Sequence, residues 1–175
     1  MHVELQEERC ALLSETMGHV RCARVADYAA ALCRGNTYEV LDGNERNVKI
    51  RTEEGRVRWF PRTCFVPAGT PLWYLVDFRI GADVEAEPCV QTEVTVVLQQ
   101  DETEPVHSET RWCYFVTPEY LRLHFEEQAS LNEPILPMQL GLNGMVLPVL
   151  NHSNIAQALR YLEMQDQLTV CTEPL

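Results

Sequence analysis

The N-terminal part of the chain alternates apolar and polar residues in short runs, separated by polar or glycine-containing turns. The runs cover residues 19–25, 37–42, 48–53 and 56–60. Strict alternation is typical of strands that bury one face, as expected for Val48 and Ile50. The pattern therefore predicts four short antiparallel strands, an arrangement typical of a small β-barrel.

The stretch 55–65, GRVRWFPRTCF, predicts the last of these strands and its end. Pro61 lacks a backbone N–H, so the strand must end there or lie at an edge. Successive side chains of a strand point to opposite faces, so at most one of Trp59 and Phe60 belongs to the core. Val57 is expected on the same face as Trp59. This face is expected to form the contact surface if the two halves of the chain pack together.

Two longer apolar runs, 90–100 and 110–116, predict a pair of strands in the C-terminal part. Thr117 is a favoured N-cap residue and Pro118 a favoured first helical residue, so a helix is predicted to follow the second strand. The apolar face of this helix is expected to carry Leu121, Phe125 and Ala129.

Residues 145–150 predict a further strand, and residues 151–167 predict a further helix. Pro148 places this strand at an edge of the sheet. Asn151 or Ser153 is expected to cap the helix. The order β-β-α-β-α indicates an α+β domain in which helices cover a sheet.

The turn-rich sequence VPAGTP, residues 66–71, marks a boundary between the short alternating strands of the N-terminal part and the longer strands and helices of the C-terminal part. The expected fold class is α+β, with an antiparallel barrel followed by the sheet-and-helix domain. The predicted parts are a helical or loose segment at 1–18, the barrel at 19–68, a linker or connector at 69–89 and an acidic α+β domain at 90–175. Within the connector, the apolar run 72–80 is either a buried strand or a link between the halves.

Charge divides the chain at the same place. Residues 1–68 contain ten Lys/Arg and ten Asp/Glu, whereas residues 69–175 contain four Lys/Arg and sixteen Asp/Glu and account for the whole net charge of -12. Such an acidic surface disfavours nucleic acid and anionic membranes, and it would speed association with a basic protein partner. Solubility is the simpler explanation of the charge.

The basic residues between positions 46 and 62 have aromatic residues beside them, a combination that occurs in grooves that bind single-stranded nucleic acid. Glutamates are interleaved with them, so no nucleic acid is expected as a partner. Alternating arginine and apolar residues are more simply the solvated face of a strand.

The chain contains none of the common catalytic or metal-binding motifs. Its seven cysteines form no C-x-x-C pair, its five histidines form no zinc-binding pair, and no phosphate-binding glycine loop is present. We therefore expect no catalytic, cofactor-binding or metal-binding residues. The odd number of cysteines and an N-terminus without an apolar leader indicate a cytoplasmic protein.

The sequences GNTYEVLD, at 35–42, and GRVRWFPRTCF, at 55–65, resemble the opening and closing strands of SH3-like barrels. Phe60 and Pro61 match the Phe-Pro near the end of eukaryotic SH3 domains. Thr63 and Cys64 stand where that ending has an asparagine and the peptide-contacting tyrosine. The resemblance implies the barrel fold but not the polyproline-binding activity.

Residues 90–175 combine an acidic strand, an aromatic strand, the helix start TPEYL, the strand MVLPVL and the final helix SNIAQALRYLEMQDQL. This combination resembles bacterial immunity proteins of contact-dependent and polymorphic toxin systems. The resemblance implies inhibition of a toxin domain by surface complementarity, without catalysis.

The leading hypothesis is a non-enzymatic cytoplasmic protein that binds a basic protein partner, in its most specific version an immunity protein. One alternative is a regulatory or scaffold module with an SH3-like barrel. The other is an enzyme whose site joins the two halves, around Cys64, His107 or His124. Because loops on a rigid scaffold commonly carry contacts, the residues expected to meet the partner are Asp83, Glu85, Glu87, Asp101, Glu102, Glu104 and Trp59.

Overall fold

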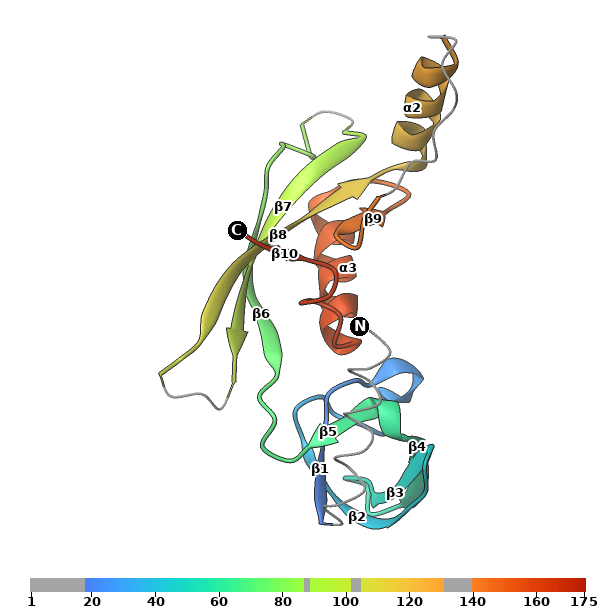
Figure 1. Cartoon of the computed structure of the whole chain (residues 1–175), viewed down its shortest axis with the longest axis vertical. Coiled ribbons are helices and arrows are strands. Elements are labelled where there is room, and N and C mark those ends of the chain that lie inside the picture. Colours follow the sequence, from blue (N-terminus) through green and yellow to red (C-terminus); the bar gives the residue numbers. More distant parts are fainter. Residues whose placement is uncertain (1–17, 87–88, 102–104, 131–139) are drawn as a thin grey trace. The chain divides into compact units, whose positions relative to one another are not determined.

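The computed structural model describes residues 18–86, 89–101, 105–130 and 140–175, and the predicted N-terminal segment lies outside them except for Gly18. The chain forms two compact units (Figure 1). The first comprises the described residues up to Leu72 together with Met164–Asp166. The second comprises Trp73–Glu163 and Gln167–Leu175. Strand β6 (Trp73–Ile80), within the predicted connector 69–89, belongs to the sheet of the second unit.

The first unit is built on a five-stranded antiparallel sheet with the strand order β4-β3-β2-β1-β5. Its strands are β1 (His19–Cys22), β2 (Thr37–Gly43), β3 (Asn47–Arg51), β4 (Val57–Pro61) and β5 (Phe65–Pro67). A short 3-10 helix, η1 (Ala26–Tyr28), follows β1, and a second, η2 (Arg62–Cys64), joins β4 to β5. An antiparallel sheet in this part of the chain was predicted and is confirmed.

The predicted SH3-like barrel is not confirmed as a closed barrel, because this sheet stays open. Strands β4 and β5 stand at its two ends and do not pair with each other. Pro61 ends β4 without an N–H to donate, and the chain then turns through η2, so that β5 pairs with β1 instead. The fold is therefore α+β, with an open sheet in place of the barrel.

Alternation along the strands produces the core of the first unit. Val48 and Ile50 are buried on one face of β3, as predicted, and Phe60 is buried on β4. The ring of Phe60 meets those of Tyr28 and Phe65 edge to face, at centroid distances of 5.4 and 6.4 Å. The side chains that complete this core are Val20, Cys22, Val25, Leu32, Tyr38 and Cys64.

The second unit is built on a mixed sheet with the order β10-β8-β7-β6, in which β9 also pairs with β8. Its remaining elements are β7 (Gln91–Gln100), β8 (Ser108–Val116), α2 (Pro118–Ser130), β9 (Gly144–Val146), α3 (His152–Met164) and β10 (Glu173–Pro174). The predicted order β-β-α-β-α omits two strands that the structure contains, β6 and β10. Strand β10 has only two residues, too few to produce a periodic pattern.

Helix α3 covers one face of this sheet (Figure 1). Ile155 and Leu159, one turn apart on α3, pack with Val94 and Val96 of β7 and with Phe115 of β8. Asn151 caps the helix as predicted, since its Oδ1 accepts a hydrogen bond from the Asn154 N–H at 2.7 Å.

Helix α2 begins where the sequence predicts, because Thr117 Oγ1 accepts the Tyr120 N–H at 3.3 Å and Pro118 is the first helical residue. Its predicted apolar face is only partly buried: Leu121 is half-buried, whereas 39% of Phe125 is exposed. Neither described helix combines the length and the apolar composition needed to cross a membrane.

Candidate protein-binding site

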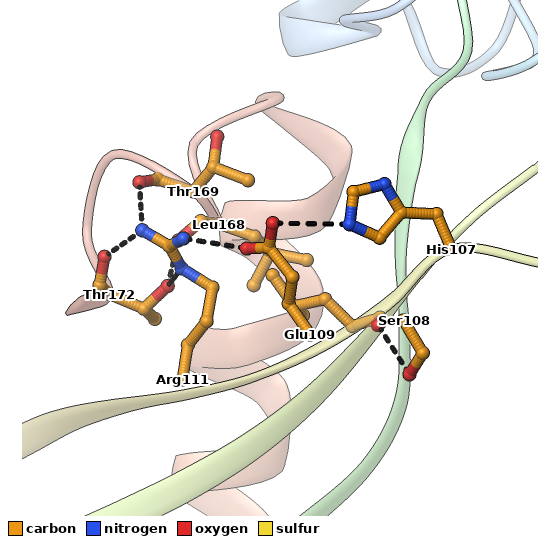
Figure 2. Close-up of polar contacts among 8 residues, drawn as sticks. His107, Ser108, Glu109, Arg111, Leu168, Thr169 and Thr172 are labelled. Carbon is orange, nitrogen blue, oxygen red and sulfur yellow. Dashed lines mark hydrogen bonds and ion pairs between the residues drawn. The ribbon is translucent and has the colours of Figure 1, made fainter. Parts of the chain in front are cut away.

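A network of polar contacts in the second unit surrounds Arg111 on β8 (Figure 2). The guanidinium donates to Thr172 Oγ1 at 2.8 Å, to the carbonyl oxygens of Thr169 and Thr172 at 3.0 and 2.6 Å, and to Glu109 Oε2 at 2.9 Å. Only 11% of the Arg111 side chain is exposed. These bonds hold the C-terminal segment against β8, next to the point where β10 pairs with it.

His107 was a candidate for an assembled active site, and the structure places it at the rim of this cluster. Its Nε2 lies 3.5 Å from Glu109 Oε1, and its ring meets Trp73 edge to face at 5.1 Å. The Glu109 carboxylate is thus shared between His107 and Arg111. Because the other guanidinium bonds go to the chain's own C-terminal segment, the cluster is organised as a structural clamp.

The other two candidates for an active site lie in different surroundings. His124 is half-buried on α2, with its ring 5.9 Å from that of Phe125. Burial raises the pKa of the Cys64 thiol, and the guanidinium that opposes this shift is Arg24. A raised pKa keeps Cys64 protonated near neutral pH, which is unfavourable for a nucleophile.

Two other buried cysteines, Cys22 and Cys113, are also poor nucleophiles. Burial raises the pKa of Cys22 and of Cys113 to about 12. No group of three or more His, Cys, Asp or Glu side chains in the described ranges is arranged to hold a metal ion.

Cys33 is exposed, and its Sγ–H donates to Glu53 Oε2 at 3.7 Å. Desolvation and then the Glu53 carboxylate raise the pKa of the Cys33 thiol, because both disfavour the thiolate. We expect Glu53→Gln to lower this pKa and to speed alkylation of Cys33 at neutral pH. The measurement is the pH profile of iodoacetamide labelling, followed by mass spectrometry of the peptide that contains Cys33.

The matched control is Glu54→Gln, since the Glu54 carboxylate is exposed and lies 3.4 Å from Arg56 Nε. This variant should leave the Cys33 profile unchanged. Equal profiles for the two variants would contradict the assignment of the pKa shift to Glu53.

The acidic residues predicted to meet a partner do not form one patch. Asp83 and Glu85 lie in the loop that leads into β7, whereas Asp101 follows the other end of that strand. A ten-residue strand is about 30 Å long, so it separates the two groups by roughly that distance. Glu87, Glu102 and Glu104 lie outside the described residues.

Two of these acidic residues have structural contacts. Glu85 Oε1 accepts the backbone N–H of His152 at 2.8 Å, which places a carboxylate at the N-terminus of α3. Asp83 Oδ1 accepts the backbone N–H groups of Glu85 and Ala86 at 3.3 and 3.2 Å. The Glu85 contact joins residues 67 positions apart, so no local sequence pattern predicts it.

Trp59 pairs with Lys49 of β3 and lies on an exposed face of the first unit's sheet. The tryptophan is 45% exposed, and the Lys49 Nζ stands 5.7 Å from its ring centroid. Val57 is also exposed on β4, whereas Phe60 is buried. The prediction that Val57 shares a face with Trp59 agrees with this burial pattern.

A groove that the sequence did not reveal runs between strand β9 and helix α3, within the second unit. It has a volume of about 570 Å³. Its lining is mostly apolar and comes from β8, β9, the residues after β9, and α3: Phe115, Met145, Val146, Leu147, Pro148, Asn154, Gln157, Ala158, Tyr161 and Leu162. We call this feature the β9–α3 groove.

The position of β9 depends on the small size of Gly144. Gly144 pairs with Tyr114, and a Cβ at position 144 would come within 2.6 Å of the tyrosine ring. The Tyr114 hydroxyl donates to the carbonyl oxygen of Leu140. Glycine thus allows β9 to lie beside β8 under this ring.

Strand β9 runs parallel to β8 and presents its other side as an edge. The Tyr114 N–H donates to the Asn143 carbonyl at 3.0 Å, and the Leu147 N–H donates to the Val116 carbonyl at 2.9 Å. Backbone groups alternate in direction along a strand, so the N–H and C=O of Val146 point away from β8. Among the described strands, β9 pairs only with β8.

The sequence predicted an edge strand at 145–150, and an edge strand is present at Gly144–Val146. The parallel partner and the nearby helix face come from residues distant in sequence, so no local pattern predicts the groove. One signal is available in retrospect: residues 140–151, LGLNGMVLPVLN, contain no charged side chain, although the surrounding domain is strongly acidic.

No protein-family model, curated protein or solved structure matches this chain.

Proposed function

We propose that this chain is a non-enzymatic protein-binding protein whose second unit binds a basic protein partner. The observation that carries the proposal is the charge of residues 69–175, which contain sixteen Asp/Glu and only four Lys/Arg. Long-range attraction between opposite fields raises the rate of association and disfavours acidic partners.

The distribution of this charge supports the proposal. Exposed carboxylates come from separate parts of the second unit, including Asp77 and Glu93 on the sheet, Glu126 on α2 and Glu173 on β10. The acidic field therefore does not depend on one loop.

Apolar side chains that could form the centre of an interface are also exposed. Val146 and Tyr161 line the β9–α3 groove, and both are exposed. Interfaces commonly combine an apolar centre with a polar rim.

The specific version of the proposal is an immunity protein that neutralises a basic toxin domain in the cytoplasm. Its test is a binding titration between the purified chain and the toxin domain encoded by the neighbouring gene, at low salt and at about ten-fold higher salt. We expect tight binding that weakens as salt screens the acidic field.

A lysozyme-sized basic protein unrelated to any toxin serves as the control for non-specific attraction. The cognate domain should bind the chain at concentrations where the control does not. Absence of binding at micromolar protein in low salt would contradict the immunity version. Binding that is equally strong at both salt concentrations would contradict the role of charge.

A further inference from the structure

We infer that the β9–α3 groove binds an extended segment of the basic partner, which adds to the sheet as a strand beside β9. This inference rests on the proposed function and specifies its mode of binding. The segment would carry apolar side chains at alternate positions, with lysine or arginine between them.

The backbone of β9 provides the first part of this site. The N–H and C=O of Val146 point away from β8, and Val146 is 45% exposed. A strand laid along this edge would exchange hydrogen bonds with these groups. Such bonds recognise any extended backbone, so they supply affinity without sequence preference.

Helix α3 provides the second part. Asn154, Gln157, Ala158, Tyr161 and Leu162 recur at three- and four-residue spacing, which places them on one face of the helix. This face stands opposite the free edge of β9 and forms the far wall of the groove. An added strand would therefore lie between a sheet edge and a helix.

The floor of the groove determines which side chains fit. Phe115, Met145 and Leu147 line it and belong to or pack against the core beneath α3. Side chains of an added strand alternate between the two faces of the sheet. Every second residue would enter this apolar floor, and those residues are accordingly expected to be valine, leucine or isoleucine.

The other edges of the same sheet are protected against strand addition. The outer strand β6 carries Asp77 and Arg79 and has an irregular register between Leu75 and Asp77. Strand β10 has two residues, one of which is Pro174. Charges, bulges, proline and short length are the usual means of blocking an edge.

Strand β9 lacks most of these protections. It is short, but no charged residue occurs between positions 140 and 151, its register with β8 is regular, and Pro148 lies beyond the strand. An uncharged edge in an acidic domain is suited to a partner strand whose apolar residues contact the groove and whose basic residues face the surrounding acidic field.

The test uses a short synthetic peptide that alternates lysine with valine or leucine, titrated into the full chain labelled with 15N. We expect the largest amide shifts at Gly144–Leu147 and on the groove face of α3. The Val146→Pro variant removes the outward N–H but keeps the bonds to β8, and it should weaken binding about ten-fold or more. Val146→Ala keeps the outward N–H and removes only side-chain contacts, so it should weaken binding clearly less than Val146→Pro does.

A second measurement needs no variant of the protein. Two further peptides carry backbone N-methyl groups, one on the lysines and the other on the apolar residues. Because N–H groups alternate in direction along a strand, only one set can face β9, so only one of the two peptides should lose binding.

The outcomes separate this inference from the proposed function. Equal binding by both methylated peptides, shifts confined to other surfaces, or no binding of the unmodified peptide to the folded chain would each overturn strand addition at β9. Salt-dependent binding of the whole basic partner would then still support the proposed function. Failure of the whole partner to bind would contradict the proposed function, whatever the peptide does.

Discussion

Replacing Arg111 by methionine is expected to lower the free energy of unfolding of the second unit by about 3 kcal/mol. The methionine keeps much of the buried volume but removes every donor of the guanidinium. The carbonyl oxygens of Thr169 and Thr172 would then lose the bonds of 3.0 and 2.6 Å that they accept now. Urea unfolding followed by tryptophan fluorescence measures the change, and Trp112 provides a probe next to the altered position.

Arg122 on α2 offers a matched control for this prediction. Among the described residues it forms two ion pairs, with Glu119 and Glu126, whereas Arg111 forms one, and 52% of the Arg122 side chain is exposed. Exposed pairs contribute little because water and salt screen them, so Arg122→Met should leave stability nearly unchanged. Equal effects of the two substitutions would show that the Arg111 clamp does not stabilise the fold.

The Phe115→Ala variant is expected to lose about 3–5 kcal/mol of stability, because it opens a cavity in a fully buried core. Phe115 has no exposed surface and packs in the cluster that joins the sheet to α3. The same ring also lines the β9–α3 groove. The measurement is again urea unfolding, with the denaturation midpoint as the readout.

Phe125→Ala removes the same side chain from a partly exposed position on α2. This control should cost about 1–2 kcal/mol, less than at position 115, because 39% of Phe125 stays exposed and its removal leaves no closed cavity. A loss at position 125 as large as that at position 115 would mean that α2 packs more tightly than its exposed surface indicates.

The parts of the fold that the sequence predicts well are those set by neighbouring residues. The alternation at Val48 and Ile50 predicted a buried strand face, and the burial of both confirms it. Thr117 was predicted as one helix cap and Asn151 or Ser153 as the other, and Thr117 and Asn151 accept the expected backbone N–H. Period and capping depend on residues within about one turn of each other, so one sequence window contains the whole signal.

The errors and omissions concern contacts between distant residues. Pro61 correctly marked the end of β4, but no local pattern indicates that β5 pairs with β1 and leaves the sheet open. The acidic loop residues were grouped by composition, whereas strand β7 holds Asp83 and Asp101 apart. Charge can be counted from a sequence, but its position on a surface depends on the fold.

The sequence by itself determined the α+β class, the strand and helix periods, the helix starts, and the acidic character of the second half. Only the tertiary structure decided which strands pair, that Arg111 secures a segment some sixty residues away, and that β9 presents an edge opposite α3. The physical reason is the range of the interactions. Periodicity and capping are local, whereas pairing partners and grooves result from the burial of whole faces against residues remote in the chain.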